Sequence, residues 1–224
     1  MIRMPSPIGI YAILDTGTLP LASLPAAAAA LAAGGIRMFQ VRAKEVPGGE
    51  MARLVREIRA ALPDDAVLLV NDRADVARVT DADGVHVGDQ DILVSDARMV
   101  LATERSGPRL VGLSTHSPEE AGRAGLSAPD YIGVGPIFSS RTKSTGRPEL
   151  GLAGLRRAVE ATSLPVVAIG GIGLADVAAV RQTGASGIAM IAELLVAGEF
   201  EARARMAVDS FARCRREPDG GAIG

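Results

Sequence analysis

The sequence predicts a single-domain (β/α)8 barrel, or TIM barrel, which is an α/β fold. Short apolar segments alternate with longer amphipathic segments along the whole chain, and eight such pairs fit within 224 residues. The apolar segments lack the in–out alternation of half-exposed strands, so we expect strands buried on both faces in a parallel sheet. Eight strand–helix units favour closure into a barrel. The alternative is an open doubly wound sheet, but no GxGxxG motif follows the first strand.

The expected strands are Ile8–Asp15, Arg37–Arg42, Val67–Asn71, Gly84–Val87, Leu110–Ser114, Tyr131–Val134, Val166–Ile169 and Gly187–Ile191. The expected helices are Leu21–Ala33, Gly49–Leu62, Ala74–Val79, Val94–Thr103, Pro118–Leu126, Leu152–Ala161, Leu174–Thr183 and Phe200–Arg213. Gly34 and Gly35 are typical of residues just beyond a helix end. Ser117 followed by Pro118 and two glutamates is typical of a helix start.

Composition excludes several classes of protein. We expect one domain over residues 1–216 and a disordered Gly-rich tail over 217–224. One cysteine, Cys214, excludes an internal disulfide framework, and two histidines exclude a His-rich metal site. With a net charge of −2 and no apolar run long enough to cross a bilayer, we expect a cytoplasmic protein without nucleic-acid or membrane partners. A homodimer is compatible with the sequence.

Polar and glycine residues follow the predicted strands where a barrel of this kind carries its active site. Gly170-Gly171-Ile172 follows the seventh strand, and Ile191-Ala192 ends the eighth. Barrels often bind phosphate at this position through backbone N–H groups, and glycine lets the backbone approach the anion closely. The alternative is a pair of ordinary tight turns. We expect a phosphate site here.

Two carboxylates, Asp72 and Asp91, follow the third and fourth strands. Neighbouring strands lie about 5 Å apart, so the two side chains could share one cation. Oxygen ligands beside a phosphate suit Mg²⁺, which takes one or two carboxylates and keeps several waters. The alternative is that Asp72 caps the third helix and Asp91 the fourth.

Cationic residues gather on the same rim, namely Arg42, Lys44, Arg141, Lys143 and Arg147. Such residues are often merely solvated, but Lys44 and Lys143 are the only lysines among 24 basic residues. Lysine binds phosphate as a compact point charge. A phosphate site, a Mg²⁺ pair and a cationic cluster together indicate two anionic groups. They predict a substitution in which a phosphorylated nucleophile displaces diphosphate.

The chain resembles the thiamine phosphate synthase family in an ordered set of motifs that covers the second to eighth strands. The motifs are Gln40-Val-Arg42-Ala-Lys44, Asn71-Asp72-Arg73, Gly84-Val-His86-Val-Gly88-Asp-Gln-Asp91, Gly112-Leu-Ser114-Thr-His116, Tyr131-Ile-Gly133-Val-Gly135-Pro136-Ile-Phe138, Thr142-Lys143 and Ala168-Ile-Gly170-Gly171-Ile172. The resemblance implies a barrel transferase that needs Mg²⁺. Its members join hydroxymethylpyrimidine diphosphate to thiazole phosphate, so that diphosphate leaves and the thiazole nitrogen captures the pyrimidine cation.

The resemblance also implies roles for individual residues. The pyrimidine diphosphate site would comprise Gln40, Val41, Arg42, Ala43, Lys44, Asn71, Ser114 and Lys143, of which Arg42, Lys44, Ser114 and Lys143 would be catalytic. The thiazole phosphate site would comprise Ser140, Arg141, Thr142, Gly171, Ile191 and Ala192, with Asp72 and Asp91 holding Mg²⁺. Family members commonly carry Thr at position 140 and Ser at position 192, so Ala192 offers only its backbone N–H.

We expect both histidines to support the site and not to react. His86 lies inside a predicted strand, where a packed or supporting position is expected. His116 follows Ser114 by two residues and is expected to be structural or orienting. The alternatives to a synthase are a thiazole tautomerase of the same superfamily and a non-catalytic protein that binds a phosphorylated ligand. Neither would need the full set of Gln40, Arg42, Lys44, Asp72, Asp91 and Lys143.

Overall fold

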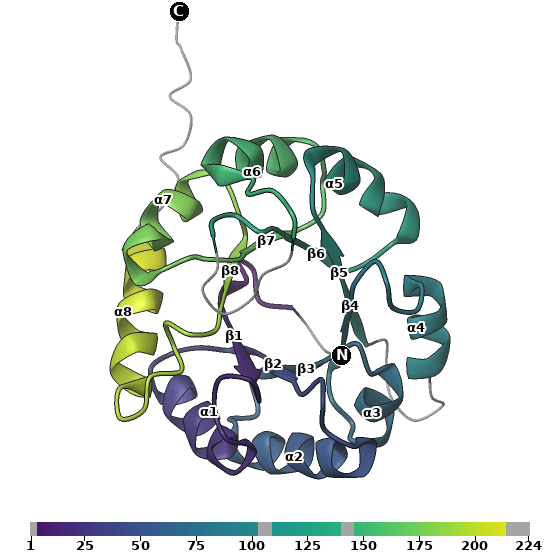
Figure 1. The fold of residues 1–224 in the computed structure, drawn as a ribbon, viewed down its shortest axis with the longest axis vertical. Helices are drawn as coiled ribbons and strands as arrows, with labels where there is room; N and C mark the ends of the chain where they lie inside the picture. Colours follow the sequence, from purple (N-terminus) through teal and green to yellow (C-terminus); the bar gives the residue numbers. More distant parts are fainter. Residues whose placement is uncertain (1–3, 103–108, 140–145, 214–224) are drawn as a thin grey trace, which may run out of the picture.

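In the computed structural model, eight parallel strands close into a barrel surrounded by helices, which confirms the predicted fold (Figure 1). The structure describes residues 4–102, 109–139 and 146–213. The strands are β1 (Gly9–Asp15), β2 (Met38–Arg42), β3 (Val67–Asn71), β4 (Gly84–Val87), β5 (Leu110–Thr115), β6 (Tyr131–Val134), β7 (Val166–Ile169) and β8 (Gly187–Met190). Strand β8 pairs in parallel with β1, with Gly187 beside Gly9, and this pairing closes the ring.

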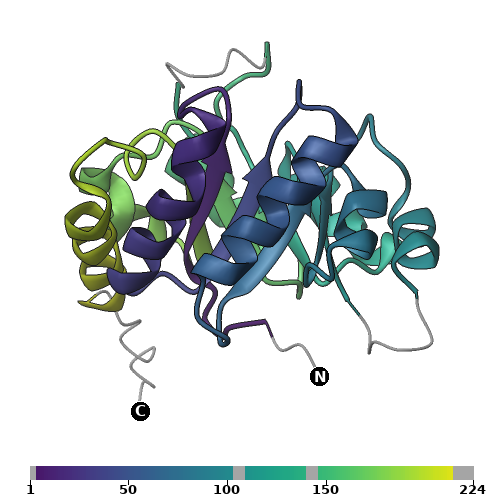
Figure 2. The same ribbon diagram turned by 90° about the horizontal axis from the view of Figure 1, so that it is seen from below.

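Helices alternate with the strands and lie outside them, as the side view shows for α1 and α2 (Figure 2). They are α1 (Leu24–Ala33), α2 (Gly48–Ala61), α3 (Ala74–Val79), α4 (Val94–Leu101), α5 (Pro118–Ala124), α6 (Gly151–Glu160), α7 (Val177–Gln182) and α8 (Phe200–Arg213). Three short 3-10 helices, η1 (Leu21–Ser23), η2 (Gly125–Ser127) and η3 (Leu174–Asp176), adjoin α1, α5 and α7.

Helix boundaries largely follow the local signals in the sequence. Ser117 caps α5, because its hydroxyl accepts a hydrogen bond from the Glu120 backbone N–H at 3.1 Å. Helix α1 ends at Ala33 with Gly34 as its C-cap, and Gly35 has a φ of +103°, as the glycine pair predicts. The helices expected to begin at Leu21 and Leu174 each begin with a 3-10 turn, and Pro25 in the first turn of α1 lacks the N–H that would bond back into it.

Two hydrophobic cores result from the alternation of side chains along each strand. One set points into the barrel and includes Tyr11, Ile13, Met38, Val67, Leu69, Leu110, Tyr131, Val167 and Ala189. The neighbouring residues point outward and pack against the helices, as Ala12, Phe39 and Val41 do. Hence each strand can place its last inward residue in the mouth of the barrel.

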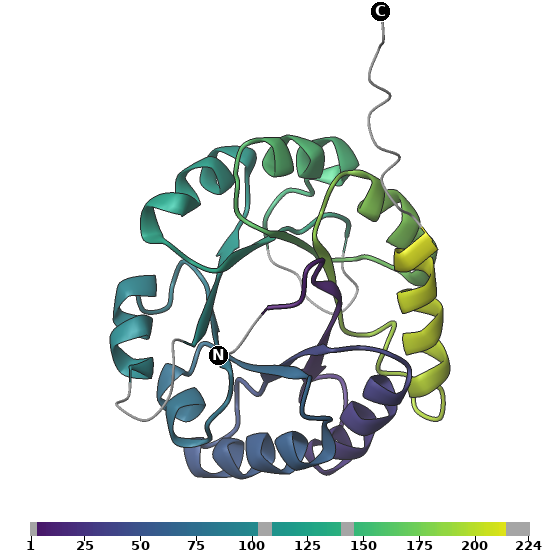
Figure 3. The ribbon, with the colours of Figure 1, turned by 180° about the vertical axis from the view of Figure 1, so that it is seen from behind.

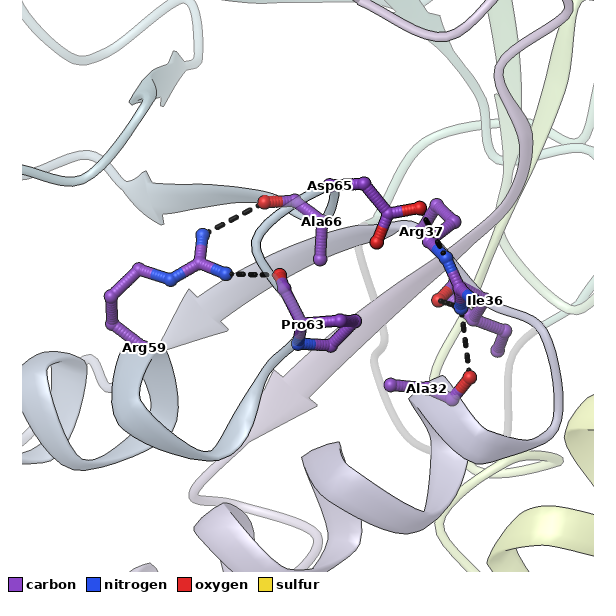
Figure 4. A network of polar contacts seen from close by, with 7 residues as sticks. All are labelled: Ala32, Ile36, Arg37, Arg59, Pro63, Asp65 and Ala66. Atoms are coloured by element: carbon purple, nitrogen blue, oxygen red, sulfur yellow. Dashed lines mark hydrogen bonds and ion pairs between the residues drawn. The ribbon is translucent and has the colours of Figure 1, made fainter.

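Two arginines, Arg37 and Arg59, form hydrogen bonds near the N-terminal ends of the strands (Figure 4). The Arg37 guanidinium donates to the Ala32 carbonyl oxygen at 2.8 Å and to the Asp65 carboxylate at 2.9 Å. Arg59 donates to the carbonyl oxygens of Ala66 at 2.8 Å and Pro63 at 2.6 Å. These contacts satisfy backbone acceptors in the connections that lead into β2 and β3.

Figures 1 and 3 view the barrel from its two ends. Within the described ranges, no helix is both long and apolar enough to cross a membrane. The expected tail, residues 217–224, lies outside the described residues.

Candidate active site at the strand C-termini

A cavity of about 380 Å³ opens inside the barrel toward the C-terminal ends of the strands. Seven of the residues that the family resemblance assigns to a substrate site line it, namely Gln40, Arg42, Asn71, Ser114, Gly171, Ile191 and Ala192. They come from five different strands or the loops that follow them, so only the closed barrel brings them together. Figure 1 shows the closed ring of strands from which these residues come.

Side chains after Phe39 in β2 alternate between the inside of the barrel and the helices outside it. Gln40 and Arg42 line the cavity, whereas the Val41 side chain is fully buried between the sheet and the helices. Val41 can therefore reach a ligand only through its backbone. A second, smaller hollow is lined by Ala43 and Lys44 together with residues Asn71 to Arg73. Asn71 lines both hollows, which places them next to each other.

Asp72 and Asp91 form a carboxylate pair beside the smaller hollow. Burial, hydrogen bonding with Asp91 and the charge of Asp91 raise the pKa of Asp72 to about 6, while Lys44 and Arg42 act in the opposite direction. The Lys44 Nζ lies 3.7 Å from an Asp72 carboxylate oxygen. Two carboxylates that repel each other at close range favour a shared cation.

Neither aspartate caps a helix, contrary to the alternative reading. The residue at the N-cap of α3 is Arg73, and the one at the N-cap of α4 is Leu93. Asp91 instead accepts a hydrogen bond at 2.7 Å from the Gly88 backbone N–H within its own loop. Asp72 has a φ of +62°, a left-handed conformation that Asp tolerates better than most residues.

The residues present fit Mg²⁺. Among the described residues, no cluster of three or more His, Cys, Asp or Glu side chains could hold a metal, which argues against a site built wholly from protein ligands. Mg²⁺ commonly binds through one or two carboxylates, with waters and substrate phosphates completing its octahedron. Asp72 and Asp91 match that donor set, because both offer hard carboxylate oxygens.

Ion pairs hold two arginines of the rim. Arg42 donates to the buried Asp15 carboxylate at 2.8 Å, and Thr18 bonds the other oxygen of Asp15 at 3.3 Å. Arg147 donates to Asp89 at 2.5 Å and holds the pKa of that carboxyl below its usual range. Asp15 was not among the predicted site residues, and its position at the end of the first predicted strand was the available signal.

The loops after β7 and β8 present backbone N–H groups to the cavity. Gly170 and Gly171 have φ values of +99° and +66°. A Cβ on Gly171 would lie 2.6 Å from the Phe138 carbonyl oxygen, so only glycine fits there. The N–H groups of Gly171, Ile172 and Ala192 donate to no acceptor in the described part of the chain, which leaves them available to an anion.

A chain of five polar side chains crosses the inside of the barrel and reaches the cavity at both ends. Gln40 Nε2 donates to Tyr11 Oη at 2.6 Å, and Tyr11 Oη lies 3.1 Å from Tyr131 Oη. Tyr131 Oη lies 2.9 Å from His86 Nδ1, and His86 Nε2 lies 2.9 Å from Ser114 Oγ. His86 thus occupies the supporting position that the sequence analysis expected.

Tyr11 and Tyr131 were not among the predicted site residues. They are the only tyrosines in the chain, and both fall within predicted strands, which was the available signal. His116 also lines the cavity, and its Nδ1 lies 2.8 Å from the Gly135 carbonyl oxygen, in agreement with an orienting role. Ser140, Arg141, Thr142 and Lys143 lie outside the described residues.

A closed barrel whose cavity opens at the strand C-termini, with polar side chains in its lining, defines the class of protein, a TIM-barrel enzyme. Residues 10–194 match the family model described as thiamine monophosphate synthase. The chain therefore belongs to the thiamine monophosphate synthase family, whose members are transferases.

Relatives cover nearly the whole chain. It is 41% identical over 211 residues to the thiamine-phosphate synthase of Myxococcus xanthus, covering 93% of this chain and 94% of the relative. It is 45% identical over 196 residues to that of Anaeromyxobacter dehalogenans, covering 88% of this chain and 84% of the relative. The thiamine phosphate pyrophosphorylase of Pyrococcus furiosus superposes with a TM-score of 0.83 at 31% identity, covering 93% of this chain and 98% of that one.

Proposed function

We propose that this protein joins 4-amino-2-methyl-5-hydroxymethylpyrimidine diphosphate to 4-methyl-5-(2-phosphooxyethyl)thiazole, giving thiamine phosphate and diphosphate. The observation that carries the proposal is one continuous site with different polar groups at its two ends. The carboxylate pair Asp72 and Asp91 lies at one end, and the N–H groups after β7 and β8 lie at the other. Asn71 joins the hollow beside the aspartates to the main cavity, so one reaction can use both ends.

The pyrimidine diphosphate takes the end of the site formed by β2, β3 and β5. Gln40 and Ser114 contact the ring, since both line the cavity. Arg42, Lys44 and Asn71 lie between the cavity and the aspartates and contact the diphosphate. Lys143 adds a further point charge to the leaving group. Asp72 and Asp91 would hold Mg²⁺, which would supply positive charge to the leaving diphosphate.

The thiazole phosphate takes the opposite end, where the N–H groups of Gly171, Ile172 and Ala192 bind its phosphate. The family resemblance assigns Ser140, Arg141 and Thr142 to the same phosphate, and Ile191 supplies an apolar wall. Ala192 has no hydroxyl, so its contribution is limited to the backbone N–H. Binding at this end directs the thiazole nitrogen toward the pyrimidine methylene carbon.

The reaction exchanges one bond for another. The bond between the pyrimidine methylene carbon and the diphosphate oxygen breaks, and its electron pair leaves with diphosphate. The lone pair of the thiazole nitrogen then forms the new C–N bond. No proton moves in either step, so the residues act by binding, orientation and charge stabilisation. Arg42 contributes from a fixed position, because Asp15 holds its guanidinium at 2.8 Å.

The two alternatives account for less of the site. A thiazole tautomerase transfers a proton and would have no use for the carboxylate pair with Lys44 beside it. A non-catalytic binder of a phosphorylated ligand would need the loops after β7 and β8 but not the diphosphate end. We propose a cytoplasmic location as well, where both phosphorylated substrates would be available.

The proposal is tested by incubating the purified protein with both substrates and Mg²⁺ and identifying the product by chromatography. We expect thiamine phosphate and diphosphate in equal amounts, and neither when one substrate is omitted. Isomerisation of a thiazole phosphate tautomer without coupling would instead show a tautomerase.

Asp91→Asn and Lys143→Ala separate catalysis from binding in the same assay. Asp91→Asn should lower kcat by roughly 100-fold or more, because removal of a group that stabilises developing charge typically costs that much. Lys143→Ala should also lower kcat. The affinity for thiazole phosphate should be unchanged in both, since neither residue contacts it. Wild-type turnover in either variant would contradict the role given to that residue.

A further inference from the structure

The five-residue polar chain from Gln40 to Ser114 uses three side chains for which the proposed reaction has no direct task, namely Tyr11, His86 and Tyr131. Both tyrosines are buried inside the barrel, with exposed fractions of 2% for Tyr11 and 0% for Tyr131. Burial raises the pKa of both hydroxyls well above the usual range, so each keeps its proton. Each hydroxyl therefore has one hydrogen to donate.

The direction of every hydrogen bond follows from the amide of Gln40. Its Nε2 can only donate, so Tyr11 Oη accepts from it. The other partner of Tyr11 within the described residues is Tyr131 Oη, and either oxygen could donate in that bond. We assign the donor to Tyr11, because its oxygen already accepts from Gln40. The Tyr131 hydrogen then has one acceptor left, His86 Nδ1.

His86 must accordingly accept through Nδ1, and a neutral imidazole then carries its hydrogen on Nε2. That nitrogen donates to Ser114 Oγ at 2.9 Å. Ser114 lines the cavity, and because its oxygen already accepts from His86, its own hydrogen is free to point at a ligand. The chain thus turns Ser114 into a hydrogen-bond donor.

The other end of the chain has the opposite character. Gln40 Oε1 makes no hydrogen bond with the described residues, and none of their buried side-chain polar atoms lacks a partner. This oxygen is therefore accessible from the cavity that Gln40 lines. It offers an acceptor, while Ser114 on the far side of the chain offers a donor.

Two glycines make room for the chain. A Cβ on Gly112 would lie 2.5 Å from Tyr131 Oη and would also collide with His86 Nδ1, the two atoms of the central hydrogen bond. A Cβ on Gly133 would lie 3.3 Å from His86 Cε1. The rings of His86 and Tyr131 pack at a centroid distance of 5.5 Å in the space so formed. Strands β5 and β6 are thus shaped around this contact.

We propose that Tyr11, Tyr131 and His86 are positioning residues that fix Ser114 as a donor and Gln40 Oε1 as an acceptor. A cavity with this pair selects a heteroaromatic ring that carries a ring-nitrogen acceptor and an amino donor. The identity of that ring as an aminopyrimidine rests on the proposed function. The direction of the hydrogen bonds from Gln40 to Ser114 does not rest on the proposed function, since it is inferred from contacts within the protein.

The tautomer of His86 tests the direction in the ligand-free enzyme. If the Gln40 amide were turned around, every hydrogen would reverse, Nδ1 of His86 would carry the proton, and Ser114 would become an acceptor. Imidazole ¹⁵N–¹H correlation spectra at neutral pH distinguish the two states. We expect a protonated Nε2 and an unprotonated Nδ1 on His86.

His116 provides an internal reference with the opposite assignment. Its Nδ1 bonds the Gly135 carbonyl oxygen, which can only accept, so this nitrogen must carry a hydrogen. The spectrum of His116→Gln assigns the two rings, since the chain has two histidines. A proton on Nδ1 of His86, alone or together with one on Nε2, would overturn the proposal.

Steady-state kinetics test the consequence for the substrate. Tyr131→Phe and His86→Leu should raise KM for the pyrimidine diphosphate about tenfold, as expected for one well-formed hydrogen bond, and leave KM for thiazole phosphate unchanged. His86→Gln keeps an amide that can donate to Ser114 and should retain more of the wild-type KM than His86→Leu. Equal effects of Gln and Leu, or equal changes in both KM values, would overturn the positioning role.

Thr183→Val is the matched control for Tyr131→Phe. Its hydroxyl is buried and donates to the Val180 carbonyl oxygen at 2.7 Å, at the end of α7 and away from the cavity lining. The Thr183→Val variant should be less stable than wild type, and both of its KM values should be unchanged. If wild-type protein couples no substrates, the proposed function fails, whereas the tautomer of His86 still decides whether the chain is directed as inferred.

Discussion

Asp72 combines an uncommon backbone with an uncommon side-chain environment. Its φ of +62° and its pKa of about 6 both cost free energy in the folded protein. Such costs persist where the surrounding structure fixes a residue, and here they place its carboxylate against that of Asp91. The sequence located both aspartates but left capping open, because helix caps and metal ligands draw on the same residue type at the same strand ends.

Asp72→Asn separates the two costs. Asn tolerates the left-handed backbone, so the variant should fold, and it removes the repulsion from Asp91. We expect the metal-free protein to be stabilised by roughly 1 kcal/mol at pH 7, given about 1.4 kcal/mol per pKa unit and partial screening by solvent. Coupling activity should fall by roughly 100-fold. Denaturant unfolding in EDTA measures the first effect, and a loss of stability would count against the assignment.

The raised pKa of Asp72 also predicts how stability depends on pH. Folding raises this pKa from 3.8 to about 6, so the folded state binds the proton more tightly than the unfolded state. The associated stability is present below about pH 4 and is lost as pH rises through about 6. In EDTA, the stability of wild type relative to Asp72→Asn should decrease over this window. A difference that is flat with pH would show that Asp72 has an ordinary pKa.

At the scale of elements, the alternation of apolar and amphipathic segments predicted all eight strands and all eight helices in order. The α-helices expected to start at Leu21 and Leu174 start later in the structure. Each is preceded by a 3-10 turn, which satisfies the same local signals. The polar chain through Tyr11, Tyr131 and His86 could not be predicted. Its contacts join β1, β6 and β4, and the register of the closed ring sets them.

The loop after β7 carries the prediction that belongs to this scale. Gly171→Ala places a Cβ 2.6 Å from the Phe138 carbonyl oxygen at a φ of +66°, so the loop must shift. We expect KM for thiazole phosphate to rise at least tenfold, because the displaced N–H groups no longer converge on the phosphate.

Gly198→Ala is the control for backbone strain alone. Gly198 has a φ of +83°, and nothing lies within 4 Å of a Cβ built there. It should cost about 1 kcal/mol of stability and leave both KM values unchanged. If the two glycine variants had the same kinetics, the loop after β7 would not bind phosphate.

Across the whole molecule, the two ends of the barrel use basic residues differently. At the strand N-termini, Arg37 and Arg59 donate hydrogen bonds to backbone carbonyl oxygens and contribute to stability. At the opposite rim, Lys44 lies beside Asp72 as a compact charge. The two lysines therefore stay a prediction for the site of the reaction, and Lys143 lies outside the described residues. A homodimer stays a prediction, which light scattering of the purified protein checks.

The central claim is that the rim with Asp72 and Asp91 couples two phosphorylated substrates in a reaction that needs Mg²⁺. The most direct measurement is the rate of diphosphate release with both substrates present, in Mg²⁺ and again after chelation with EDTA. The account predicts rapid release with stoichiometric thiamine phosphate in Mg²⁺, near-complete loss in EDTA, and recovery when Mg²⁺ is restored. Full activity in EDTA would contradict it.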